Sequence, residues 1–149
     1  TMAKLPSDLH LVIVGRQTKY QKKLDAEIKR LGIGERIHFL QGVPNDLLAA
    51  IYNQAEAFIY PSRYEGFGIP IIEAIQSGLS VVAATGSCLE EAGGPDCLYV
   101  GPDDVDGNAA AILSAIEHRK EIVSKSQRYV KRFENQDVAS QILEVYNKV

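Results

Sequence analysis

The 149-residue sequence contains no apolar run that approaches the roughly 20 residues of a membrane-spanning helix, and no signal peptide is evident at its start. Its only two cysteines, Cys88 and Cys97, form no metal-ligand pattern, which favours reduced thiols over a disulfide. The net charge of −3 and the pI near 5.6 argue against a general electrostatic attraction to nucleic acid. We therefore expect a cytoplasmic protein that has no nucleic-acid partner.

Apolar residues make up 46% of the sequence, which is enough for one hydrophobic core, and short β-rich runs alternate with longer helical runs. The expected strands are residues 9–15, 36–42, 57–61, 79–85 and 97–102. The expected helices are residues 20–32, 45–52, 69–78 and a stretch from 106 onward with a break around 133–136. Apolar strands that alternate with helices predict a single α/β domain over residues 1–149, with a doubly wound, mostly parallel sheet covered by helices on both faces.

Three side chains are expected to cap helices. Asn45 and Asp46 follow Pro44 and are suited to cap the second helix, and Asp106 is suited to cap the helix after the fifth strand. The neighbouring pair Asp104-x-Asp106 has the form of a metal-binding D-x-D motif. Because it precedes a helix here, we interpret it as a cap and expect no metal site.

The stretch YPSRYEGFGIPIIEAIQSG, residues 60–78, places two glutamates on either side of a glycine-rich turn that opens a helix. In a doubly wound sheet, ligands bind at the carboxyl ends of strands, and this turn follows the third expected strand. Free N–H groups and the helix dipole favour an anion such as phosphate, which Gly66 and Gly68 allow to approach the main chain.

Two readings of the glutamates follow from this spacing. Glu65 is placed to accept hydrogen bonds from ligand hydroxyls, and Glu73, opposite the apolar side of the helix, is placed to receive a vicinal diol such as a ribose. The alternative is structural, because a glutamate opposite an apolar face is usually only solvated and the helix dipole favours one in the first turn. Spacing alone leaves both readings open.

The residues EGFGIPIIEA resemble the E-x7-E signature of retaining glycosyltransferases with the GT-B fold, in particular family 4, the glycosyl transferases group 1. The resemblance covers the chain from about residue 9 to its end, through LHLVIVG, RIHFLQGVPNDLLAAIYNQAEAFIYPSRYEGFGIPIIEAIQSGLSVVAAT, SCLEEAGG, LYVGPDD and RFENQDVASQILEVYNKV. It implies the donor-binding domain of an enzyme that moves a sugar from a UDP- or GDP-sugar to an acceptor, with no cofactor or metal required.

The same resemblance implies roles for individual residues. Glu65 is the expected catalytic residue, holding hydroxyls of the donor sugar near the reacting carbon, and Glu73 is expected to bind the ribose. The other expected donor-binding residues are Gly66, Phe67, Gly68 and Ile69 at the sugar and diphosphate, Gly42 and Val43 beside the base, and Thr85 and Glu91 in neighbouring loops. Arg16, at the end of the first strand, is a weaker candidate for a phosphate contact, with a solvated loop as the alternative.

Two parts of the family pattern are absent from the sequence. One is the N-terminal acceptor-binding domain. The other is the first strand and helix of the donor domain, whose arginine and lysine hold the diphosphate, so we expect weak binding and no activity from the chain alone. The missing strand would lie between residues 11–14 and 57–60. The sheet must then close the gap, borrow a strand from a neighbour, as in a homodimer formed by strand pairing, or be incompletely represented by this sequence.

The identity of the acceptor is open at this stage. A polysaccharide or a lipid-linked glycan is expected, with peripheral membrane contact by the full-length protein. Two alternative functions remain. One is a non-catalytic module that binds nucleotide sugars, and the other is a related GT-B enzyme such as a nucleotide-sugar epimerase or a glycogen-type synthase.

Overall fold

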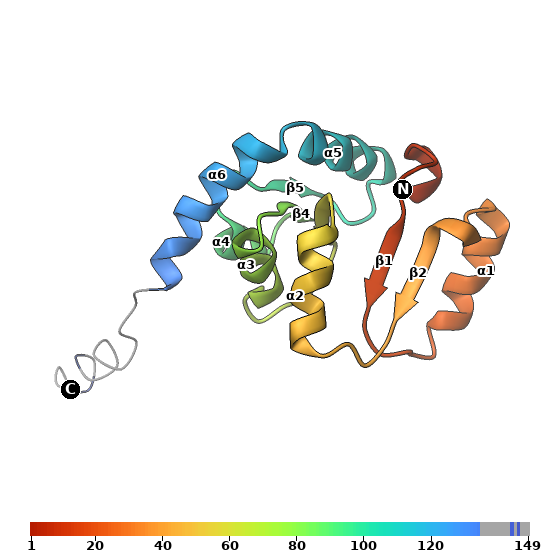
Figure 1. Cartoon of the computed structure of the whole chain (residues 1–149), viewed down its shortest axis with the longest axis horizontal. Coiled ribbons are helices and arrows are strands. Elements are labelled where there is room, and N and C mark those ends of the chain that lie inside the picture. The colour runs from red at the N-terminus through yellow and green to blue at the C-terminus, as the bar shows by residue number, and fades with distance from the viewer. Residues whose placement is uncertain (135–143, 145, 147–149) are drawn as a thin grey trace.

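The computed structural model describes residues 1–134, 144 and 146, and all the strand pairs in this part of the chain are parallel. Strands β1 (Leu11–Val14) and β2 (Ile37–Leu40) form one sheet. Strands β3 (Ala57–Tyr60), β4 (Ser80–Ala84) and β5 (Leu98–Val100) form a second sheet with β4 in the middle (Figure 1). The expected strands are all present, but they are divided between two sheets.

Six α-helices follow the strands in the described residues (Figure 1). They are α1 (Gln21–Leu31), α2 (Asn45–Gln54), α3 (Ile69–Gln76), α4 (Leu89–Gly93), α5 (Val105–Glu117) and α6 (Arg119–Val130). Short 3-10 helices occupy Met2–Lys4, Gly34–Arg36 and Lys131–Phe133. The β1–β2 pair lies between α1 and α2 in Figure 1, so helices flank both sides of the sheets and the α/β fold class is confirmed.

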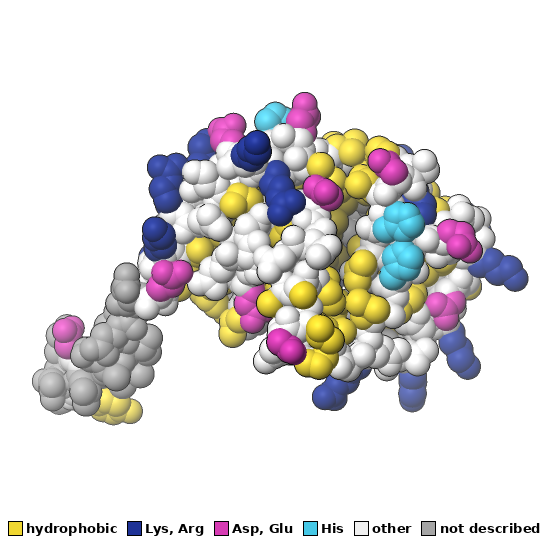
Figure 2. Space-filling model, in the orientation of Figure 1, with side chains coloured by type: hydrophobic (Ala, Val, Ile, Leu, Met, Phe, Trp, Pro, Cys, Tyr) yellow, Lys and Arg dark blue, Asp and Glu magenta, His cyan; other side chains and the backbone are white. Residues whose placement is uncertain are grey.

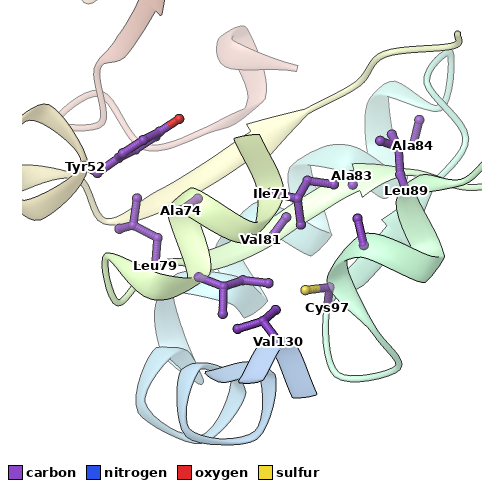
Figure 3. Close-up of a cluster of buried hydrophobic side chains, with 12 residues drawn as sticks. Tyr52, Ile71, Ala74, Leu79, Val81, Ala83, Ala84, Leu89, Cys97 and Val130 are labelled. Atoms are coloured by element: carbon purple, nitrogen blue, oxygen red, sulfur yellow. The ribbon is translucent and has the colours of Figure 1, made fainter. Parts of the chain in front are cut away.

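Both faces of the three-stranded sheet are covered, because successive residues of a strand point to opposite faces. Val81 and Ala83 of β4 belong to a core cluster with buried residues of α3, α4 and α6, as Figure 3 shows. Val82 points the other way, into a cluster with buried residues of α5. All five residues of β4 are buried, and four of them are apolar, as expected for a central parallel strand covered on both faces.

The expected helix caps were wrong in detail. Pro44 is the N-cap of α2 and no side chain caps that helix, since Asn45 is already its first helical residue. Asp104, and not Asp106, caps α5 by accepting a hydrogen bond from the Gly107 N–H at 2.8 Å. Asp106 lies in the first turn and pairs with Lys4. Asp104 has the non-helical backbone that a cap requires, and Asp106 does not.

The C-terminal helical stretch also breaks earlier than expected. His118 leaves helical geometry, with φ −99° and ψ 18°, and divides the stretch into α5 and α6. Helix α6 ends at Val130 and the 3-10 turn Lys131–Phe133 follows it. Of the expected closing helix over 137–149, the structure describes residues 144 and 146, and residues 135 and 136 of the expected break lie outside the described residues.

The two sheets are separated by a cavity. Among the described residues, β1 pairs only with β2, and β3 pairs only with β4, so one edge of each strand carries no strand partner. A cavity of about 360 Å³ lies between them, lined by β1, β3 and mostly apolar side chains of α2 and α5. Figure 2 shows hydrophobic side chains gathered over α2 and along the hollow beside it. The gap expected between residues 11–14 and 57–60 is therefore not closed by pairing of β1 with β3.

Candidate functional site: the glycine turn and its two carboxylates

The turn after β3 is shaped by Gly68, which is the N-cap of α3 and has φ +115°. L-residues rarely adopt that angle. A Cβ at this position would lie 2.9 Å from Leu89 Cδ2 and 3.2 Å from Ala92 Cβ, so the glycine also permits close packing of α3 against α4. Gly66 has nothing within 4 Å of the equivalent point. Gly68 is thus required by the fold, whereas Gly66 borders open space that a ligand can enter.

The main-chain N–H groups at the start of α3 point to an anion site. In the described residues, no protein group accepts a hydrogen bond from the N–H of Gly66, Phe67, Gly68 or Ile69, and the first bond at this end runs from Ile71 N to Gly68 O at 2.9 Å. Pro70, at the second helical position, has no N–H to satisfy. Unpaired N–H groups together with the positive end of the helix dipole favour a bound phosphate.

Glu65 is exposed to solvent but held at two points. Its Oε1 accepts a hydrogen bond from the Tyr60 hydroxyl at 2.8 Å, and its main-chain carbonyl accepts one from Cys88 Sγ at 3.2 Å. Burial of the phenol, and then its bond to Glu65, raise the pKa of Tyr60 to about 12. The phenol therefore keeps its proton at neutral pH and remains the donor of this bond.

Glu73 lies on the exposed side of α3, opposite the buried Ile71 and Ile75. A hollow of about 330 Å³ opens beside it, between α2 and α3. The hollow is lined by Asn45, Leu48, Ala49, Tyr52, Glu73, Gln76 and Ser77. Burial, and then the negative charge of Glu73, raise the pKa of Tyr52. Glu73 thus faces a partly polar space that can hold a hydroxylated group.

A row of aromatic rings connects the surroundings of the two glutamates. Tyr52 packs edge-on against Phe58, with ring centroids 5.5 Å apart, and Phe58 stacks on Tyr60 at 5.7 Å. Glu73 acts on the first ring of this row and Glu65 on the last. Each end of this row of rings therefore lies near one of the two carboxylates.

Two of the weaker candidates are engaged with other protein groups. The Thr85 hydroxyl donates to Glu90 Oε1 at 2.7 Å, and the Gly86 N–H donates to the same oxygen at 2.8 Å, which lowers the pKa of Glu90. The side chain of Glu91 is exposed, and its carbonyl accepts a bond from the Tyr129 hydroxyl at 2.9 Å. Glu90 is a loop-organising residue that sequence reasoning missed.

The remaining candidates lie on the other side of the gap between the sheets. Gly42 has φ +63°, and Val43 lines an apolar hollow of about 530 Å³ between α2 and the β1–β2 pair. Arg16 lines a separate hollow of about 160 Å³ with residues of α1 and β2. No hydrogen bond or ion pair in the described part of the chain joins these residues to Glu65 or Glu73. Nor do residues 1–134 contain a group of three side chains suited to hold a metal ion.

The comparisons with known proteins agree on one family. The model of the family described as "Glycosyl transferases group 1" matches residues 1–141. The MMP alpha-(1->4)-mannosyltransferase of Mycolicibacterium hassiacum is 36% identical over 81% of this chain and 31% of its own length. The O-antigen chain mannosyltransferase B of Escherichia coli is 34% identical over 74% of this chain and 30% of its own length. The chain thus spans less than a third of the length of these relatives.

The fold has a solved counterpart as well. The crystal structure of Anabaena Alr3699/HepE in complex with UDP matches 99% of this chain and 43% of that chain, with a TM-score of 0.81 and 24% sequence identity. At that identity the likeness concerns the fold. None of the helices in the described residues is long and apolar enough to cross a membrane. The match over residues 1–141 and the identity to the two mannosyltransferases establish that the chain belongs to the glycosyl transferases group 1 family.

Proposed function

We propose that this chain is the donor-binding domain of a retaining glycosyltransferase that transfers a hexose from a nucleoside diphosphate sugar. The observation that carries the proposal is the glycine turn, where unpaired N–H groups of residues 66–69 lie between the carboxylates of Glu65 and Glu73. A nucleoside diphosphate sugar has its diphosphate between two hydroxylated groups, the sugar and the ribose. The order of sugar, diphosphate and ribose in such a molecule therefore matches the sequence order of Glu65, the N–H groups of residues 66–69 and Glu73.

Each part of the turn then has a role in the reaction. The N–H groups of Phe67, Gly68 and Ile69 hydrogen-bond the diphosphate and stabilise the charge that develops as it leaves. Glu65 accepts hydrogen bonds from sugar hydroxyls and keeps the anomeric carbon next to the acceptor. Glu73 binds the ribose diol from the hollow between α2 and α3. The helix terminus supplies the electrostatic stabilisation, so the proposal needs no metal.

The relatives and the solved structure guide the choice of donor and acceptor. The two named relatives are mannosyltransferases, and the solved counterpart was crystallised with UDP, so we propose a GDP- or UDP-linked hexose and favour mannose. One of these relatives acts on an O-antigen chain, by its name. A polysaccharide or lipid-linked glycan is accordingly our proposed acceptor, bound by a further domain, with the reaction in the cytoplasm at the membrane surface.

Calorimetric titration of the chain with GDP-mannose and with UDP-glucose tests the proposal. We expect weak binding of at least one of them and a loss of about tenfold in affinity in Glu73→Gln, because a charge-assisted hydrogen bond is removed. Glu117→Gln is the matched control, since Glu117 is an exposed glutamate at the end of α5. Absence of binding, or binding that Glu73→Gln leaves unchanged, contradicts the proposal.

We further propose that an additional apolar strand completes the sheet between β1 and β3. The open edges of both strands border the same cavity of about 360 Å³, and a strand in that position would be central, as β4 is, with both faces covered. Sedimentation equilibrium and hydrogen exchange test this. A monomer with fast-exchanging edge amides in β1 and β3 supports it, and a dimer with protected edge amides would assign the contact to a second copy.

A further inference from the structure

Tyr60 is the last residue of β3, and its hydroxyl is the only group in the described residues that donates a hydrogen bond to the Glu65 carboxylate. The bond is 2.8 Å long and ends on Oε1. A hydrogen bond to one oxygen of a carboxylate anchors that oxygen and restricts the directions in which the other can point. The second oxygen, Oε2, is then presented in a defined direction for a ligand.

The direction of the Tyr60 ring is set by the protein and not by a ligand. Its ring stacks on Phe58 with 20° between the planes, and Phe58 is held in turn by the edge of Tyr52 at 82°. Tyr60 and Phe58 both belong to β3, whose register is fixed by pairing with β4. The hydroxyl is thus positioned by the packed sheet.

The main chain of Glu65 is fixed separately. Cys88 Sγ, at the N-cap of α4, donates to the Glu65 carbonyl at 3.2 Å, and Arg63 in the same loop pairs with Asp103 before α5. With the backbone held, the freedom left to Glu65 is rotation of an exposed side chain. Ordering such a side chain on binding costs free energy, which a bond made before binding removes.

We propose that Tyr60 is a positioning residue, whose hydroxyl orients Glu65 so that Oε2 faces a hydroxyl of the donor sugar. This inference rests on the proposed function, because it assigns Oε2 to the sugar of a nucleoside diphosphate sugar. It adds a residue to the site that makes no contact with the ligand itself. The hydroxyl remains protonated at neutral pH, as the raised pKa of Tyr60 requires.

A double-mutant cycle on binding tests the inference. The chain is titrated with GDP-mannose and GDP, and with UDP-glucose and UDP, and the ratio of affinities within each pair measures the contribution of the sugar. Tyr60→Phe should lower that ratio about fivefold and leave binding of the bare nucleotide unchanged. Glu65→Gln should lower the ratio at least as much, and the double variant should lose no more than Glu65→Gln alone.

A matched control separates positioning from packing. Tyr99→Phe removes another tyrosine hydroxyl, one that donates to Gly94 O at 2.8 Å and lies outside the site. It should lower the melting temperature without changing the sugar ratio. If Tyr60→Phe changes only the melting temperature, or if the losses from Tyr60→Phe and Glu65→Gln add, the inference is wrong.

The same titrations distinguish failure of the proposed function from failure of the inference. The proposed function is overturned if the wild-type chain binds neither nucleotide pair, or if Glu65→Gln leaves the ratio of affinities for sugar nucleotide and bare nucleotide unchanged. A wild-type chain whose sugar ratio depends on Glu65 but not on the Tyr60 hydroxyl overturns only the role of Tyr60.

Discussion

The two sheets of this protein differ in how completely their residues are buried. In the three-stranded sheet, all of β4 is buried, and each of the helices α3 to α6 contributes buried residues to one of the two core clusters. In the two-stranded sheet, β1 and β2 each alternate half-buried with exposed residues, and α1 has no buried residue. Val12 and Leu40 remain 43% and 37% exposed. We call the β3–β5 sheet with helices α3 to α6 the well-packed region, and β1, β2 and α1 the sparsely packed region, whose two strands pair in residues 1–134 only with each other.

This difference in packing bears on how the residues of the candidate site are held in place. The turn with Glu65, Gly68 and Glu73 belongs to the well-packed region, so the groups proposed to hold sugar, diphosphate and ribose are fixed by a complete core. Gly42 and Arg16 belong to the sparsely packed region. We infer that the base end of the site depends on whatever completes the sheet, whereas the sugar end does not.

The two regions should differ most in the stability that is lost when a leucine side chain is removed. Leu89 is fully buried in α4 and Leu40 is 37% exposed in β2. Leu89→Ala should lower the free energy of unfolding by about 3 kcal/mol, because it leaves a cavity in the core. Leu40→Ala should cost less than about 1 kcal/mol. Urea denaturation of both variants measures the difference, and equal losses would show that the two regions are equally well packed.

A glycine in each region gives the second comparison. Gly68→Ala should lower the free energy of unfolding by roughly 2 kcal/mol. An alanine there would have to adopt φ +115°, and its Cβ would lie 2.9 Å from Leu89 Cδ2. Gly32→Ala, at the end of α1 with φ +65° and nothing within 4 Å, should cost about 1 kcal/mol. Thermal unfolding measures both values. A Gly68→Ala variant as stable as the wild type would contradict the strained geometry of the turn.

Much of the well-packed region could be predicted from sequence, because its signals are local. The strand positions follow from apolar runs, and the start of α3 follows from Gly68 and Pro70. The contacts that sequence did not reveal depend either on loop geometry or on residues far away in the chain. Tyr60 and Glu90 are single polar side chains whose bonds depend on loop geometry. Arg119 lies in a stretch that the sequence predicts as one helix, and it donates to carbonyls 41 and 64 residues away. The spacing of apolar residues gives no sign of such long-range bonds.

Arg119 therefore gives the third comparison. Its guanidinium donates to Gly78 O at 3.0 and 3.1 Å and to Ala55 O at 3.0 Å, joining the ends of α2 and α3. Arg119→Met should cost about 2 kcal/mol, since it leaves partly buried carbonyls unpaired. In the sparsely packed region, the one ion pair that Arg30 makes with the described residues is an exposed pair with Glu27, so Arg30→Met should lower the free energy of unfolding by less than about 0.5 kcal/mol. Urea denaturation compares the two variants, and similar losses would show that the Arg119 hydrogen bonds add little to stability.

The smallest expected effect appears at alkaline pH and also belongs to the well-packed region. Burial raises the pKa of the Cys97 thiol to about 11 from an ordinary value of 9.0, and burial raises the pKa of Tyr99, beside it, as well. The folded protein keeps protons that the unfolded chain releases, so this stabilisation is complete below pH 9 and is lost as the pH rises towards 11.

We expect the free energy of unfolding to fall by about 1 kcal/mol between pH 8.5 and 10.5 through Cys97. Cys97→Ala removes the thiol and should make that decline smaller, although it lowers stability at every pH. Cys88→Ala is the control, because Cys88 is only half-buried and lies at the N-cap of α4. Urea denaturation at four pH values measures the slope. If the free energy of unfolding falls with pH equally in both variants and the wild type, the Cys97 thiol is already accessible to hydroxide in the native protein. The core around Cys97 would then open more readily than its burial indicates.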